Sequence, residues 1–152
     1  MRIILGSLLA ATALGAAAGA QAPAASAVGS MSDLMVKMIY PTSDAIFYIT
    51  TREPKTEADW GELQAKALTL AESANLLTIP GRICSNGAPV PVKDAAWAAF
   101  VQQLRNGSMQ AYQAAKTKDQ DKMIDASNAV NASCEGCHRK WRSPRTPANR
   151  CK

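Results

Sequence analysis

The chain has 152 residues, with 17 Lys and Arg against 12 Asp and Glu, which gives a formal net charge of +5. Apolar residues make up 47% of it and aromatic residues 5%, and it contains 4 cysteines and 1 histidine. This composition excludes a disordered tail and a collagen-like fibre. The single histidine excludes metal sites with several histidine ligands, and the length predicts one domain.

The first residues are expected to be an export signal. Arg2 is followed by an uncharged, largely apolar stretch over residues 3–20, and the small-residue sequence ASA at residues 25–27 fits a cleavage site. We therefore expect residues 1–27 to be a secretory signal peptide, with cleavage after Ala20 as an alternative. An uncleaved signal would act as a membrane anchor. The expected location is the periplasm, a compartment that permits disulfides.

The exported domain, residues 28–152, is predicted to be all-α, because its apolar residues recur at steps of three and four without strand alternation. A first helix is expected over residues 32–50, with a kink or break at Pro41. A second helix is expected to begin near Thr56, which with Asp59 resembles a capping box.

A third helix is expected over residues 93–116, weakened in its middle by Gly107 and Ser108, and a fourth over residues 119–142. Their apolar stripes include three aromatic residues, Trp97, Phe100 and Trp141. Of the connections between the four helices, only the one over residues 80–91 is long. Short connections make sequential helices antiparallel neighbours, so the predicted fold is an up-down-up-down four-helix bundle.

The motif that points to function is the sequence CEGCH at residues 134–138, because C-x-x-C-H is the attachment signature for c-type haem. Residues three apart on a helix share a face, so Cys134 and Cys137 can form thioethers with the two vinyl groups of one porphyrin edge. His138 can then reach the iron, and Gly136 is expected to let the backbone approach the macrocycle. The motif predicts one covalently bound haem c.

Three other interpretations of the motif are a redox-active thiol pair, half of a structural zinc site and a simple disulfide. A thioredoxin-like pair belongs near a βαβ unit, and no strand is expected here. Zinc needs two further ligands at comparable spacing, whereas Cys84 and Cys151 are isolated and the chain has no second histidine. Haem attachment is therefore favoured.

With its export signal, helical pattern and C-x-x-C-H near the C-terminus, the chain resembles the class II c-type cytochromes, the cytochrome c-prime and cytochrome c-556 group. The resemblance covers about residues 30–141, and its specific part is the haem motif. It implies a four-helix bundle with haem near one end and His138 as the proximal ligand. It also implies either an open sixth position on the iron or a methionine from the first helix.

Bundle geometry also favours a methionine ligand, because the start of the first helix and the end of the fourth lie at the same end of such a bundle. Met35 lies about one turn from that start and His138 about one turn from that end, so Met35 is the expected second ligand. Met38 is the next candidate, and Met31 is expected to precede the helix. Core packing by Met35, an open iron site, and a lysine or cysteine ligand are the alternatives.

Other residues are expected at the same end. Cys84 and Cys151 are predicted to form a disulfide that pins the tail across the haem end and stabilises the fold by about 4 kcal/mol. Two free thiols or an intermolecular bridge are the alternatives. Arg82, in the long loop, is a candidate partner for a haem propionate, and a solvated position is its alternative.

Charge is uneven along the chain. Basic residues without any acidic one follow the histidine: Arg139, Lys140, Arg142, Arg145, Arg150 and Lys152. Such a tail suits a redox partner with an acidic docking surface, although basic residues also stabilise a helix C-terminus through its dipole. The tail lacks interleaved aromatic residues, so we do not expect nucleic-acid binding.

Together these features predict a periplasmic one-electron carrier whose haem iron is bound by His138 and Met35. Such a carrier needs no catalytic acid or base, so we do not expect an enzyme. One alternative is a five-coordinate, cytochrome c-prime-like protein that binds small gases such as nitric oxide. Another is a haem subunit of a larger dehydrogenase complex, and a homodimer is an alternative to a monomer.

Overall fold

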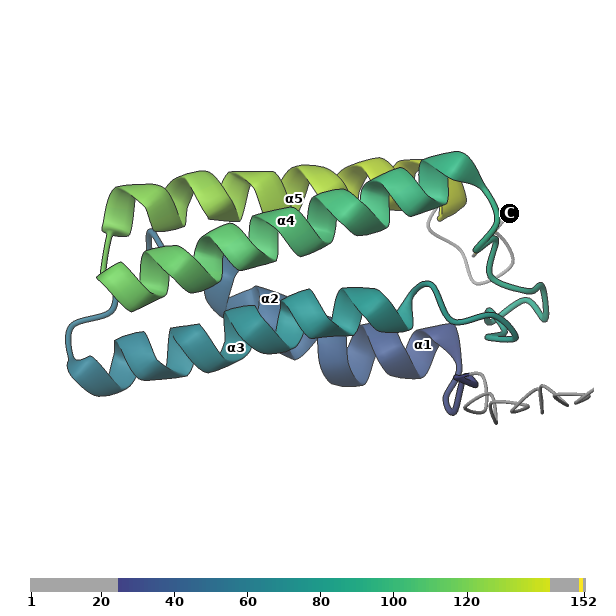
Figure 1. Ribbon diagram of the computed structural model, residues 1–152, viewed down its shortest axis with the longest axis horizontal. Helices are drawn as coiled ribbons and strands as arrows, with labels where there is room; N and C mark the ends of the chain where they lie inside the picture. The colour runs from purple at the N-terminus through teal and green to yellow at the C-terminus, as the bar shows by residue number, and fades with distance from the viewer. Residues whose placement is uncertain (1–24, 143–150, 152) are drawn as a thin grey trace, which may run out of the picture.

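The computed structural model describes residues 25–142 and residue 151 (Figure 1). The predicted signal peptide falls almost wholly outside the described residues, as does most of the basic tail. Within the described part, no helix is long and apolar enough to span a membrane.

The regular structure of the described residues is helical, apart from one isolated β-bridge between Ile83 and Pro89. In chain order the elements are α1 (Met31–Leu34), the π-helical turn η1 (Met35–Ile39), α2 (Tyr40–Phe47), α3 (Glu57–Leu76), α4 (Ala95–Thr117) and α5 (Gln120–Trp141). The helices pack lengthwise against one another (Figure 1). The prediction of an all-helical fold of packed helices is confirmed.

The break expected at Pro41 is absent, because α1, η1 and α2 follow one another without a gap over residues 31–47. In place of a break, one turn is widened, with the backbone N–H of Tyr40 donating to the carbonyl of Met35 five residues earlier. Proline lacks an N–H, and its ring crowds the carbonyl four residues before it. A wider turn just ahead of Pro41 relieves that crowding.

Two helices of the fold begin with a capping box. At the start of α3, the backbone N–H of Asp59 donates to the Thr56 hydroxyl at 3.2 Å, and the N–H of Thr56 donates to the Asp59 carboxylate at 2.8 Å. This confirms the prediction from the sequence. Ser30 and Asp33 form the same box at the start of α1, so Met31 is the first residue of that helix and does not precede it.

Gly107 and Ser108 do not interrupt α4, which is continuous from Ala95 to Thr117. A Cβ on Gly107 would lie 3.0 Å from the backbone nitrogen of Val130, so the glycine lets α4 and α5 cross closely. The buried Ser108 hydroxyl donates to the carbonyl of Leu104 at 2.7 Å and is thereby satisfied within the helix. The segment of α4 that was expected to weaken the helix is therefore the place where α4 packs closely against α5.

Gly136, in the middle of the C-x-x-C-H motif, has a packing role that the sequence did not predict. A Cβ at this position would overlap the ring of Phe100 on α4. The packing of α5 against α4 therefore requires a glycine here, and the approach of the backbone to a macrocycle stays a prediction.

Gly136→Ala is expected to destabilise the protein by about 1–3 kcal/mol, because the Phe100 ring must leave its packed position. Gly61→Ala is the matched control, since Gly61 lies on the exposed side of α3 with no atom near its missing Cβ. The control should raise stability by roughly 0.5–1 kcal/mol. Denaturant unfolding of both variants measures the difference, and equal stabilities would contradict this role of Gly136.

Candidate functional site

The start of α1, the loop between α3 and α4 and the end of α5 lie together at one end of the molecule (Figure 1). The backbone N–H of Met31 donates to the carbonyl of Ile83 in the loop at 3.0 Å. A disulfide joins Cys84 of the loop to Cys151 of the tail, with 6.1 Å between their Cα atoms. The N–H of Cys151 donates to the carbonyl of Trp141, so the tail returns to the end of α5.

The C-x-x-C-H motif lies in the last turns of α5. Its two cysteines, Cys134 and Cys137, are half-buried and form no disulfide. Burial raises the pKa of both thiols, that of Cys137 to about 12, where the neighbouring Cys134 adds to the effect. The thiolate is the form that attacks a disulfide or binds zinc, so this environment does not favour a thiol redox pair or a zinc site.

Two adjoining cavities, of about 120 and 300 Å³, lie beside the motif. They share five lining residues, Met35, Val36, Cys137, His138 and Arg142. The smaller cavity extends toward the disulfide, and its further lining includes Met31, Cys84, Trp97, Trp141 and Cys151. The larger extends along the first helix and α5, and its further lining includes Ile39, Tyr40, Phe47, Phe100 and Cys134. A mostly apolar lining with few convergent polar groups is typical of cofactor sites.

The three candidate methionines differ in their burial and in which cavities they border. Met35 is half-buried and borders both cavities together with His138. Met38 is 39% exposed and borders neither cavity. Met31 is buried in the core and borders the smaller cavity only. Met35 is therefore the methionine that shares the whole cavity system with His138.

The π-helical turn contributes to this placement of Met35. A π turn adds one residue to a helix, which rotates the preceding residues by about 100° relative to a regular α-helix. η1 begins at Met35 and ends just before Tyr40, the first residue of α2. The extra residue therefore places Met35 on a different side of the helix, relative to α2, from the side it would occupy in a regular α-helix. Pro41 thus acts on the site through the wide turn that precedes it.

Arg82 does not border either cavity. It is 5% exposed, and its guanidinium donates to the backbone carbonyls of Gly29 and Leu76. These bonds tie the segment before α1 to the end of α3. The basic side chain that does border both cavities is Arg142, directly after α5.

Three aromatic residues that the sequence pattern placed in helix stripes also belong to the site. Trp141 packs edge-to-face against Trp97, with 5.1 Å between ring centroids, and against Phe100 at 6.1 Å. The indole N–H of Trp97 donates to the carbonyl of Leu77 at 3.0 Å, which fixes that ring. The spacing of Trp141, one turn after Cys137 on the same helix, was the signal that could have identified it.

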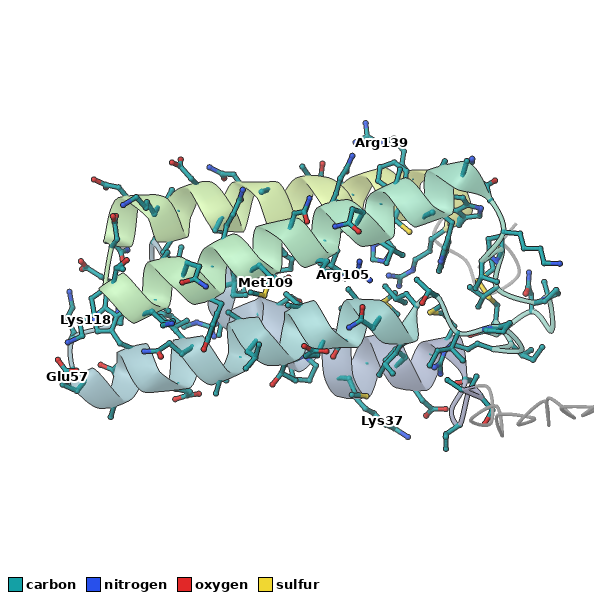
Figure 2. All side chains as sticks on the ribbon, viewed as in Figure 1. Lys37, Glu57, Arg105, Met109, Lys118 and Arg139 are labelled. Atoms are coloured by element: carbon teal, nitrogen blue, oxygen red, sulfur yellow. A yellow bond between two sulfur atoms is a disulfide. The ribbon has the colours of Figure 1, made fainter. Side chains whose placement is uncertain are left out.

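The described basic residues after His138 are Arg139, Lys140 and Arg142. Arg139 is 77% exposed and pairs with Glu135 at 3.7 Å, and Figure 2 shows it pointing away from the bundle. Lys140 pairs with Asp94 at the start of α4. Arg145, Arg150 and Lys152 lie outside the described residues.

Within the described residues, no group of three or more His, Cys, Asp or Glu side chains could hold a metal ion. A haem iron needs no such group, since the protein adds only axial ligands to it. Comparisons of the chain with protein-family models, with curated proteins and with solved structures gave no match.

Proposed function

We propose that the protein is an exported mono-haem c-type cytochrome of the class II kind that carries single electrons. The proposal includes an up-down-up-down bundle with its haem at the end formed by α1 and the end of α5. The observation that carries it is that the C-x-x-C-H motif and Met35 border one largely apolar cavity system. The haem would supply a one-electron iron couple.

Each residue has a role in this proposal. Cys134 and Cys137 would hold the haem covalently from α5, and His138 would be the axial ligand from the same helix. Met35 would be the second ligand from the first helix. A thioether paired with an imidazole raises the reduction potential, which suits an electron carrier.

Exposed apolar side chains at the edge of the larger cavity support an apolar occupant. Val36 and Tyr40 are each 61% exposed although both border this cavity. A bound porphyrin would cover part of that surface, which otherwise leaves large apolar groups in contact with water.

With His138 bound to the iron, as proposed, the site would offer little for acid–base catalysis. The carboxylate that borders the cavities, among the described residues, is Glu135, which is 59% exposed and pairs with Arg139. A general acid or base with a shifted pKa is usually buried beside its substrate. We therefore propose electron transfer without substrate turnover.

We also propose a periplasmic location and a redox partner with an acidic docking surface. The disulfide between Cys84 and Cys151 suits an oxidising compartment. Arg139 and Lys140 each pair with an acidic residue of the bundle, so the partner would be attracted mainly by the remaining charges of the tail.

The test is expression of the full chain in a bacterial host that attaches haem to C-x-x-C-H motifs. The purified protein should keep its pigment in acidified organic solvent and show a low-spin spectrum with a methionine-to-iron charge-transfer band. A colourless protein, or release of the pigment, would contradict the proposal. A high-spin spectrum with rapid carbon monoxide binding would favour the gas-binding alternative, and co-purification with a larger enzyme would favour the dehydrogenase subunit.

A further inference from the structure

Arg142 lies at the cavity system, and no side-chain hydrogen bond of the described residues accounts for the position of its guanidinium. It is half-buried and borders both cavities. Its backbone N–H donates to the carbonyl of His138 at 2.9 Å, which fixes it one turn beyond the histidine. Its side-chain Nε is buried and has no hydrogen-bond partner. A buried donor without a partner costs free energy, so the position calls for an acceptor.

The other charged groups nearby are already paired within the protein. The two terminal nitrogens of Arg82 donate to backbone carbonyls, and although its Nε also lacks a partner, Arg82 borders neither cavity. Glu135, the carboxylate at the larger cavity, lies within ion-pair distance of Arg139. Among the described residues, Arg142 is thus the arginine that faces the cavity system.

We propose that Arg142 binds a carboxylate of the cofactor, a haem propionate, and thereby raises the reduction potential. The inference rests on the proposed function. A guanidinium presents planar donors that match both oxygens of a carboxylate, and such charge-assisted pairs are among the strongest hydrogen bonds in proteins. The pair would satisfy the buried Nε donor of Arg142.

The effect on potential follows from the charge of the pair. An unpaired propionate places a negative charge near the iron, which stabilises the ferric form. Arg142 offsets that charge in a partly buried site, where interactions between charges are stronger than in water. Removing the guanidinium should therefore favour the oxidised protein.

The experiment compares Arg142→Gln with Arg139→Gln in the haem-loaded protein. Both variants remove one positive charge near the end of α5, but Arg139 is 77% exposed and borders neither cavity. We expect Arg142→Gln to shift the reduction equilibrium constant about tenfold toward the ferric form, which is about 59 mV for one electron. Arg139→Gln should shift it by less than about twofold, because an exposed charge is screened.

Two further measurements separate binding of the propionate from a structural role. Arg142→Lys keeps the charge and should recover part of the potential. The propionate bending band in the resonance Raman spectrum should shift in Arg142→Gln and stay unchanged in Arg139→Gln. Equal potentials for the two glutamine variants, or an unchanged propionate band in Arg142→Gln and Arg142→Lys, would overturn the inference.

The outcome is distinguishable from failure of the proposed function. Attachment through Cys134 and Cys137 does not depend on Arg142, so every variant should retain covalent haem. Absence of covalent haem in the wild-type chain would refute the proposed function. Covalent haem with a potential that does not respond to Arg142 would refute this inference alone.

Discussion

Replacing both motif cysteines, Cys134→Ala together with Cys137→Ala, is expected to abolish covalent haem attachment. The two thiols lie one turn apart on α5 and both border the larger cavity, where they can reach one edge of a porphyrin. Without them, His138 and Met35 could hold haem only through the iron. The pigment that remains with the polypeptide in acidified organic solvent should therefore fall from one haem per chain to none.

The matched control is Cys84→Ala together with Cys151→Ala. This variant also removes two sulfur atoms from the same end of the molecule, but they form the disulfide that joins the loop to the tail. It should lower the free energy of unfolding by about 4 kcal/mol in a chain-entropy estimate. It should still carry covalent haem, measured by absorbance after extraction. Loss of covalent pigment in the control, or its retention in the motif variant, would refute the assignment of the thioethers.

Local patterns in the sequence predicted the helices well, because the evidence for a helix lies within one segment of chain. The apolar spacing located the helices, and the box formed by Thr56 and Asp59 located the start of α3. Pro41 marked an irregularity correctly, but the sequence did not show that the chain would widen one turn to keep the helix continuous. That choice depends on packing of both halves of the helix against the rest of the fold.

Residues whose roles depend on contacts between segments were harder to predict. The sequence places Gly136 in the motif but does not show its packing against Phe100, 36 positions earlier on another helix. The loop position of Arg82 predicts a propionate contact at the haem end, but its guanidinium donates to the carbonyls of Gly29 and Leu76. A basic residue close to the motif, Arg142, borders the cavities instead. Chain position predicts which end of a bundle a residue reaches, and packing decides where its side chain points.

Met35→Ala is expected to convert a low-spin, six-coordinate spectrum into a high-spin one and to remove the methionine-to-iron charge-transfer band. The sulfur of Met35 would compete with external ligands for the sixth position on the iron. If the wild-type site is open about 1% of the time, removal of that competitor should tighten carbon monoxide binding by about 100-fold. The reduction potential should fall as well, because a thioether ligand favours ferrous iron.

Two other methionines test whether this effect belongs to Met35. Met38 is 39% exposed and borders neither cavity, so Met38→Ala should leave the spectrum and the carbon monoxide affinity unchanged. Met31 is buried, so Met31→Ala should cost about 2–5 kcal/mol of stability but keep the low-spin spectrum. An unchanged spectrum in Met35→Ala would move the ligand elsewhere, and a high-spin spectrum in Met38→Ala would move it to that residue.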